Sequence, residues 1–368
     1  MKSQQDTGHS QTTESTEAAS PTRVDQSPFG RALAGAVGKL TLLACLPTLL
    51  ALAARWHWSL DLLTHFRVWY VLALAAGAIV SLTFRQRKTA LVAALVCGWN
   101  VALIAPFYLG GSPTEPVATA AMVGPPAEVA ALAPSTSDSN TALRAMSINV
   151  LSSNLRTDDV VAVVREQQPD FVFFMEVDRR WMEALAELES MYPHRLDARR
   201  SDAFGAAFFS KLPPRRMEVV ELSGIDLPSV SAELELPNGR TLSLLATHPL
   251  PPVGRARSAA RNTQLAAAAE MVGAMSGPKM LLGDLNATGW SPYFADLLDV
   301  AGVRDSRHGF GVQGSWGPRR GLLSWLPRLP IDHILVSDEI EMIDHRIGPH
   351  IGSDHLPVTV DLRVRGVK

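Results

Sequence analysis

The sequence predicts an α/β layered domain that follows three membrane-spanning helices. Residues 32–110 are rich in Ala, Leu and Val with few charges, while residues 144–368 have the mixed composition of a soluble domain. From residue 144 onward, stretches with strand and helix patterns alternate, which is typical of sheets covered by helices on both faces. About 225 residues are enough for one large hydrophobic core.

Three apolar stretches, 36–54, 67–84 and 89–109, predict the membrane helices within residues 32–110. A bilayer-spanning helix needs about 20 apolar residues, with about 17 as the lower limit. The first stretch is the shortest, since Lys39 would have to snorkel to the interface. It ends in the small residues "ALAA" at 51–54, so a cleaved signal peptide is an alternative to a first span. A helical hairpin buried in a soluble protein is the alternative for all three.

Basic residues in the short loops predict the orientation in the membrane. The loop 85–88, "RQRK", separates the second and third spans, whereas no Lys or Arg follows the third span until Arg144. Positive residues stay on the cytoplasmic side. We therefore expect a multi-pass protein of the cell (inner) membrane, with the N-terminus inside and everything after residue 110 extracytoplasmic. Arg55 and Arg67 lie in the predicted outer loop, against this rule.

Two polar segments flank the membrane region. Residues 1–31 are rich in Ser, Thr and Gln and predict a disordered cytoplasmic tail, because they bury too little apolar surface. Residues 111–143 are rich in Pro, Ala and Ser and predict a flexible linker. The only cysteines, Cys45 and Cys97, lie in predicted spans. The domain 144–368 therefore has no disulfide, thiol nucleophile or cysteine metal site.

The C-terminal domain alternates predicted strands with predicted helices. The strands are 145–151, 169–177, 205–210, 241–248, 279–284, 331–337 and 358–364, and the helices are 157–168, 256–275 and 292–300. Thr157 is the expected N-cap of the first helix, with Asp158 and Asp159 in its first turn. Arg261, Asn262 and Gln264 are expected on the solvated face of the long helix, with phosphate contact as the alternative.

Polar residues stand at the ends of these strands, where an apolar interior would not tolerate them without partners. They are Asn149, Glu176, His248, Asp284, Asn286, Asp332, Asp354 and His355. Each alone has a simple explanation, such as an acid facing water or a turn in which Ser and Asp side chains bond nearby backbone. Their occurrence together at strand ends of one domain indicates a functional site.

The set "N…E…H…GDLN…IDH…SDH" resembles the endonuclease/exonuclease/phosphatase superfamily over roughly residues 144–365. This superfamily includes exonuclease III-like and DNase I-like nucleases, neutral sphingomyelinases and inositol-polyphosphate 5-phosphatases. The resemblance implies a four-layer α/β sandwich, in which two packed, mainly antiparallel or mixed sheets are flanked by helices. It also implies a hydrolase of phosphoric esters that uses Mg²⁺ or Mn²⁺.

The resemblance implies the metal site. Glu176 matches the principal metal ligand of the family, and Asn149 and Asp354 match positions that complete or flank the site. The chemistry agrees, because a phosphate ester repels nucleophiles and a hard cation with oxygen ligands neutralises its charge.

The remaining matched residues take catalytic roles by the same resemblance. Asp284 matches the residue that orients or deprotonates the attacking water, with Asn286 hydrogen-bonding nearby. His355 and His248 match histidines on the phosphate side. Asp332 would hold the other imidazole nitrogen of His355, which fixes its tautomer and raises its basicity.

Three functions fit these residues. The favoured one is a membrane-anchored phosphodiesterase or phosphatase that acts outside the cytoplasm on a lipid headgroup or small phosphoester. A nuclease of the same fold is the alternative, and a catalytically idle, membrane-tethered binding module is a third. Residues 144–368 contain 25 Lys and Arg against 28 Asp and Glu, a net charge of −3, whereas duplex-binding proteins normally present a basic face. A local basic patch is still conceivable from Arg199, Arg200, Arg215 and Arg216.

Overall fold

The computed structural model describes residues 28–109, 140–318, 324 and 326–366. Most of the predicted tail (1–31) and of the predicted linker (111–143) lies outside these residues. The first helix already begins at Pro28, within the last residues assigned to the tail, and the first strand begins at Thr141, before the predicted domain start.

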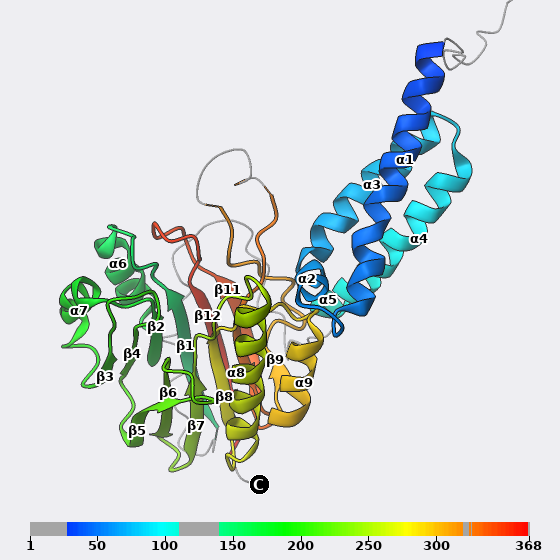
Figure 1. The fold of residues 1–368 in the computed structure, drawn as a ribbon. Helices are drawn as coiled ribbons and strands as arrows, with labels where there is room; N and C mark the ends of the chain where they lie inside the picture. Colours follow the sequence, from blue (N-terminus) through cyan, green and yellow to red (C-terminus); the bar gives the residue numbers. More distant parts are fainter. Residues whose placement is uncertain (1–27, 110–139, 319–323, 325, 367–368) are drawn as a thin grey trace, which may run out of the picture.

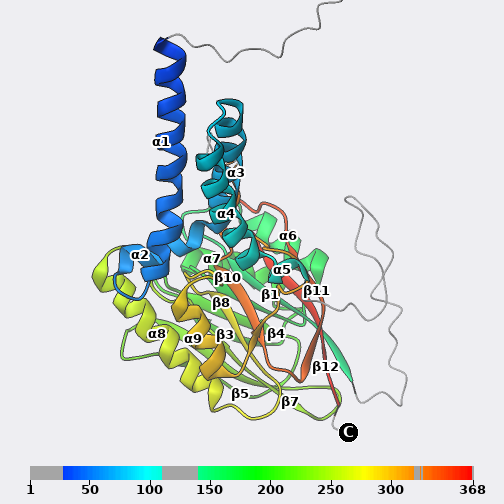
Figure 2. The ribbon, with the colours of Figure 1, turned by 90° about the vertical axis from the view of Figure 1, so that its right-hand side faces the viewer.

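Three long helices project together from one end of the C-terminal domain (Figures 1 and 2). They are α1 (Pro28–Leu50), α3 (Arg67–Thr83) and α4 (Arg87–Ile104); short helices at the domain end are η1 (Ala51–Ala53), α2 (Trp58–Leu62), η2 (Leu63–Phe66) and α5 (Pro106–Leu109). Three helical stretches are long and apolar enough to cross a membrane. The predicted third span divides after Ile104, because Pro106 lacks the N–H that would continue the helix.

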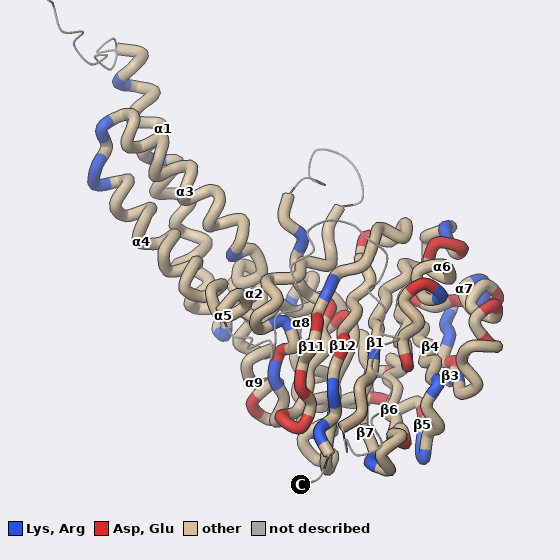
Figure 3. The backbone as a smooth tube through the Cα atoms, turned by 180° about the vertical axis from the view of Figure 1, so that it is seen from behind, with Lys and Arg blue, Asp and Glu red and all other residues tan. Residues whose placement is uncertain are grey.

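The two ends of this helical unit differ in charge. Figure 3 shows basic residues at the turn between α3 and α4, at the end of the helices away from the C-terminal domain. This turn contains Arg85, Arg87 and Lys88. The opposite end of the unit meets the domain, so the domain and the basic turn lie on opposite sides of the apolar helices.

The helical unit is docked onto the domain through specific hydrogen bonds. The indole N–H of Trp69 donates to the carbonyl of Pro327 at 2.7 Å, and that of Trp290 donates to the carbonyl of Leu103 at 3.1 Å. The carbonyl of Phe107 accepts from two backbone N–H groups of the domain, those of residues 309 and 311. The helical unit and the domain therefore share an interface in addition to the chain that connects them.

The domain contains two six-stranded sheets. The first has the order β11-β12-β1-β2-β4-β3 and the second β5-β6-β7-β8-β10-β9. The strands of the first are β1 (Thr141–Asn149), β2 (Phe171–Met175), β3 (His194–Ala198), β4 (Ala206–Ser210), β11 (Ile340–Ile347) and β12 (Val358–Val364). Those of the second are β5 (Pro214–Glu221), β6 (Pro228–Glu235), β7 (Thr241–Ala246), β8 (Lys279–Asp284), β9 (Arg304–Asp305) and β10 (Asp332–Val336). Only β1/β2 and β7/β8 pair in parallel.

Helices cover the outer faces of both sheets (Figure 1). The helices α6 (Thr157–Gln167) and α7 (Arg179–Leu185), with η4 (Ala186–Leu188), cover the first sheet, while α8 (Arg255–Gly273) and α9 (Pro292–Ala301) cover the second. Side chains such as Phe173, Leu244 and Val360 fill the space between the sheets. The predicted four-layer α/β sandwich is confirmed.

Two local predictions are wrong. The helix α6 begins at Thr157, and the residue at its N-cap position is Arg156, which makes no side-chain cap bond; Asp158 and Asp159 do lie in the first turn. Arg261 and Gln264, expected on a solvated face, are 0% and 2% exposed, because α8 packs against the second sheet and Arg261 bonds to Asp61 of the helical unit.

The sheet topology brings the polar strand ends together. The parallel strands β1 and β2 end at the same edge, and so do β7 and β8. The antiparallel register of β10 with β8 sets Asp332 directly opposite Asp284. The backbone N–H of Asp284 lies 3.1 Å from the sulfur of Met175, so the edges of the two sheets meet.

Candidate active site

The strand ends surround a cavity of about 330 Å³. Six of the eight predicted site residues line it: Glu176, His248, Asp284, Asn286, Asp354 and His355. The other two lie directly behind them, since Asn149 Nδ2 is 3.4 Å from Asp284 Oδ2 and Asp332 bonds to His355. The structure therefore brings all eight residues to one site.

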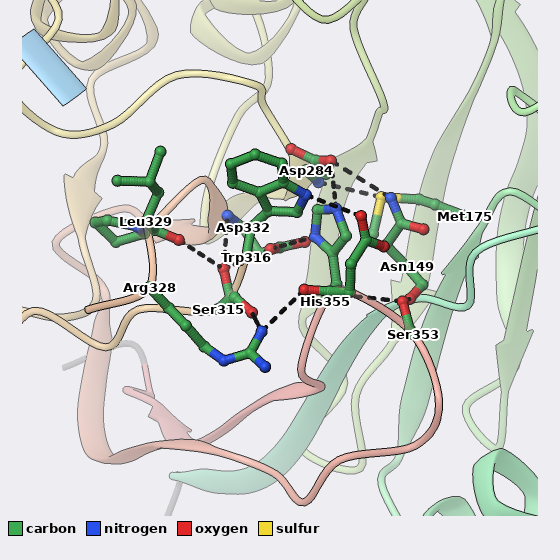
Figure 4. A network of polar contacts seen from close by, with 12 residues as sticks. Asn149, Met175, Asp284, Ser315, Trp316, Arg328, Leu329, Asp332, Ser353 and His355 are labelled. Atoms are coloured by element: carbon green, nitrogen blue, oxygen red, sulfur yellow. Dashed lines mark hydrogen bonds and ion pairs between the residues drawn. The ribbon is translucent and has the colours of Figure 1, made fainter. Parts of the chain in front are cut away.

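A buried chain of hydrogen bonds holds the imidazole of His355 (Figure 4). His355 Nδ1 lies 2.8 Å from Asp332 Oδ2, which also accepts from the hydroxyl of Ser315 at 2.5 Å. Burial lowers the pKa of His355, but the carboxylates of Asp332 and Asp284 outweigh burial and raise this pKa to about 10. The raised pKa favours the protonated ring, whose Nε2 faces the carboxylate of Asp284.

Asp284 lies at the centre of the polar side chains. Its Oδ1 accepts from the backbone N–H of Asn286 at 2.9 Å, and its Oδ2 lies 3.4 Å from His248 Nε2 and 3.5 Å from His355 Nε2. Burial raises the pKa of Asp284, but the imidazoles of His355 and His248 lower this pKa by a larger amount, so the net shift is downward. Burial also opposes protonation of His248, yet Asp284 gives that histidine a raised pKa. The group therefore combines a carboxylate acceptor with cationic donors.

The backbone near the cavity adopts conformations that side chains rarely take. Glu176, directly after β2, has φ 63°, and Asn286, after β8, has φ 48°. Both angles are left-handed, which costs free energy in non-glycine residues and is concentrated at functional sites. Gly283 has φ 139°, and a Cβ there would lie 1.9 Å from the carbonyl oxygen of Thr247. The glycine of "GDLN" is thus required for β7 and β8 to approach each other before the site.

The acidic residues fit a divalent cation. Asp354 Oδ2 accepts from the indole N–H of Trp316 at 3.1 Å, but its Oδ1 is buried with no hydrogen-bond partner among the described residues. Among the described residues, the carboxylate of Glu176 accepts one hydrogen bond, from the backbone N–H of Ser152 to Oε2 at 3.2 Å. An unpaired buried carboxylate oxygen is costly. Carboxylate and amide oxygens are the ligands that Mg²⁺ prefers, so Glu176, Asp354 and Asn149 suit such an ion.

A second group also has ligand spacing. Single ligand atoms of Asp284, Asp332 and His355 lie within 4.8 Å of one another. However, both His355 and Ser315 bond to one oxygen of Asp332, so in this structure the group forms a hydrogen-bond network.

Sequence reasoning missed several residues that support the site. Ser353 donates from its hydroxyl to the carbonyl of Asn149 at 2.8 Å and accepts from the backbone N–H of His355 at 3.0 Å. Ser315 and Trp316 lie in the stretch "GSWGP" at 314–318, between the family motifs "GDLN" and "IDH", and this position was the available signal for them.

The membrane unit also contributes to the cavity. Leu62, His65 and Phe66 line it together with the strand-end residues. They lie 75 to 79 residues before the start of β1 at Thr141, and no motif connects them with the site.

Comparison with known proteins identifies the family and the fold of the domain. The model of the Endonuclease/Exonuclease/phosphatase family matches residues 146–355. The 3′ phosphatase NExo from Neisseria, solved with a product DNA hairpin, is 22% identical, and the match covers 59% of this chain and 98% of that chain with a TM-score of 0.51. TDP2 from D. rerio, solved with a single-strand DNA product, is 16% identical, with 60% and 98% covered and a TM-score of 0.52. These two structures share the fold of the domain. No curated protein matches the sequence.

Proposed function

This chain belongs to the endonuclease/exonuclease/phosphatase family, and from that membership and the cavity we propose a membrane-anchored, divalent-metal-dependent phosphoesterase. It is a hydrolase of phosphoric ester bonds. We propose that its substrate is a phosphodiester or phosphomonoester, either a lipid headgroup or a small phosphoester, outside the cytoplasm. The observation that carries the proposal is the cavity that holds Glu176, Asp284 and His355 together.

The proposed metal ligands are Glu176, Asn149 and Asp354. A Mg²⁺ or Mn²⁺ bound there would neutralise charge on the phosphate oxygens. The unpaired oxygen of Asp354 supports this assignment.

The proposed catalytic groups act on the attacking water and the phosphate. The low pKa of Asp284 keeps it ionised, so that it can orient a water and accept its proton. His355 and His248, both with raised pKa, can donate hydrogen bonds to phosphate oxygens. Asp332 fixes the orientation of His355, and Asn286 holds its position beside Asp284 through a bond from its Nδ2 to the carbonyl of Pro249 at 3.0 Å.

The membrane anchoring and orientation are proposed from the helical unit. The basic turn between α3 and α4 lies away from the domain, as expected for a cytoplasmic turn. The two basic residues in the outer loop have partners, since Arg55 pairs with Asp296 at 2.7 Å and Arg67 donates to Asn100 Oδ1 at 3.1 Å. They do not contradict the orientation. A phosphatase-type reporter fused after residue 140 should be active only when exported; an inactive but expressed fusion would reverse the assignment.

A nuclease of the same fold is the second candidate, because two structures that share the fold hold DNA. The four arginines considered as a basic patch argue against a nuclease, because each already forms an ion pair. Arg199 pairs with Asp197, Arg200 with Asp202 and Asp226, Arg215 with Glu235, and Arg216 with Glu218. A patch whose charges are already paired contributes little to binding of a phosphate backbone.

The test uses the full-length protein in detergent. With Mg²⁺ or Mn²⁺ it should hydrolyse bis-p-nitrophenyl phosphate, and EDTA should abolish the hydrolysis. Glu176→Ala and His355→Ala should each lower kcat by about 10²-fold or more. Glu183→Ala on α7 and His194→Ala on β3, which do not line the cavity, are the matched controls. Unchanged turnover in the first pair would remove the site assignment, and faster cleavage of DNA than of the small ester would favour the nuclease.

A further inference from the structure

The segment His57–Phe66, here called the membrane junction, lies between η1 and α3 and contributes to the active-site cavity. It comprises α2 and η2 with the residue before them. Three of its side chains, Leu62, His65 and Phe66, line the cavity. The wall of the active site is therefore built partly by the membrane unit.

A buried ion pair holds the membrane junction in place. Asp61 Oδ2 accepts from Arg261 Nη2 at 2.5 Å, and Asp61 Oδ1 accepts from the hydroxyl of Ser291 at 2.7 Å. Asp61 is 1% exposed and Arg261 0%. Arg261 Nη1 also donates to the carbonyl of Asn286 at 2.9 Å. One guanidinium thus links the junction to the loop that carries a proposed catalytic residue.

The imidazole of His65, which lines the cavity, has one nitrogen without a partner among the described residues. Its Nδ1 lies 3.0 Å from the hydroxyl of Thr288 and 3.4 Å from that of Thr64, whereas its Nε2 is buried with no partner among the described residues. When Thr288 donates to Nδ1, Nε2 carries the proton. A buried N–H at the wall of a phosphoester cavity lacks only an oxygen acceptor, which a bound substrate would supply.

The rest of the cavity wall near the junction is apolar. Besides Leu62 and Phe66, it contains Phe204, Pro251, Pro252, Val253, Leu329 and Ile331. Val253 is 70% exposed, so part of this wall faces outward. A free, water-soluble phosphoester would leave this apolar surface in contact with water, whereas a substrate with hydrocarbon next to its phosphate would cover it.

A second cavity of about 560 Å³ adjoins this wall on the membrane helices. It is lined by Val68, Val71 and Leu72 of α3, and by Val101 and Ile104 of α4, among others. Two segments contribute neighbouring residues to the two cavities: Phe66 lines the first and Val68 the second, and Leu329 lines the first while Arg328 lines the second. Apolar side chains therefore line one cavity at the active site and another on the candidate membrane spans.

We propose that the membrane junction is a specificity element of the active site, which selects a phosphoester carried by a membrane lipid. His65 Nε2 donates to an oxygen of the phosphoester, Leu62 and Phe66 contact the first part of its hydrocarbon, and the groove on α3 and α4 takes the chain. This inference rests on the proposed phosphoesterase activity and narrows its substrate class.

The first experiment compares acylated and deacylated inhibitors on the full-length protein in detergent. Phosphatidylglycerol in mixed micelles and its deacylated form, glycerophosphoglycerol, compete with bis-p-nitrophenyl phosphate. The acylated compound should inhibit at least about tenfold more tightly, which is about 1.4 kcal/mol. Phe66→Ser should reduce this ratio toward one, while Leu109→Ser, an exposed apolar residue of α5 outside both cavities, should preserve it. Equal inhibition by both compounds, or an unchanged ratio in Phe66→Ser, would overturn the inference.

The proposed function and this inference fail separately. Hydrolysis of bis-p-nitrophenyl phosphate with no preference for the acylated compound keeps the enzyme and removes the lipid specificity. Absence of hydrolysis removes the enzyme, and direct binding of the two compounds, measured by tryptophan fluorescence, then still tests the junction.

The second experiment separates a substrate contact of His65 from a structural role. In His65→Asn the amide replaces Nδ1 beside Thr288, and in His65→Gln it replaces Nε2 at the cavity. A substrate contact predicts that His65→Asn weakens inhibition by the acylated compound about tenfold while its Tm stays close to that of the wild type. His65→Gln should retain the inhibition and lose Tm instead. The reverse pattern would show that His65 only supports the fold.

Discussion

Two buried ionic networks meet at the cavity, and they differ in what they hold together. The Asp332–His355 pair joins β10 to the residues before β12 within the domain. The Asp61–Arg261 pair joins the membrane unit to α8, across 200 positions in the sequence. The first network raises the pKa of a histidine that we propose faces phosphate, and the second fixes a wall of the cavity. The domain supplies the proposed catalytic groups, whereas the helical unit contributes to the shape of the site.

Breaking the first network should have the largest effect on catalysis. In Asp332→Asn, His355 loses the carboxylate that chiefly raises its pKa, and kcat should fall about 10²- to 10³-fold. Steady-state kinetics of the full-length protein with bis-p-nitrophenyl phosphate measure this, with His194→Ala as the control. A kcat within a few-fold of wild type would mean that the network is only structural.

Breaking the second network should affect stability more than chemistry. Arg261→Met leaves the Asp61 carboxylate buried without its partner, which costs about 3–5 kcal/mol. The double variant Asp61→Asn with Arg261→Met removes both charges and should recover much of this loss. Unfolding of the wild type, the single variants Asp61→Asn and Arg261→Met, and the double variant in detergent gives the coupling free energy. Losses of unfolding free energy that simply add in the double variant would contradict a direct pair. A kcat per folded molecule equal to that of the wild type would show that this network, unlike the first, does not affect catalysis.

The same contrast explains what the sequence predicts. The strand patterns place Glu176, Asp284 and Asp354 at strand ends, and the family motifs give them roles, because the sheet register is set by local periodicity. The strand patterns do not predict the edge strands β3, β5, β9 and β11 or the inner strand β6. Polar residues such as Arg195 and Glu218 interrupt the apolar pattern of β3 and β5, and β9 has only two residues.

The membrane junction could not be predicted from the sequence. His65 and Arg261 look like an ordinary loop histidine and a solvated helix cation, because their partners are distant in the sequence. Only the docking of the helical unit onto α8 and α9 buries them. Contacts across such a junction leave no periodicity in either segment.

Acid should destabilise the domain through two histidines outside both networks. Burial, helped by Arg307, lowers the pKa of His333 and of His345 to about 3 in each case. The unfolded chain binds these protons near pH 6.5, so their contribution is complete above that pH and is lost as the pH falls toward 3. At pH 5 each histidine should cost about 2 kcal/mol. His345→Gln should flatten the fall in unfolding free energy between pH 7 and 5, and an unchanged slope would contradict the assignment.

The smallest effect is expected from the exposed ion pair at the same interface. Arg55 and Asp296 are 2.7 Å apart, with side chains 55% and 51% exposed. Solvent screens such pairs, so Asp296→Ala should change stability by about 0–1 kcal/mol. A loss as large as that from Arg261→Met would show that burial is not what distinguishes the two contacts.

The docked membrane unit also has a kinetic consequence. If the candidate helices span a bilayer, the cavity docked beside them is held at a fixed distance from the bilayer surface. For a lipid phosphoester, encounters would then occur by lateral diffusion in two dimensions. Turnover should follow the mole fraction of substrate in the surface, and diluting that surface with inert lipid should slow the reaction at constant total substrate.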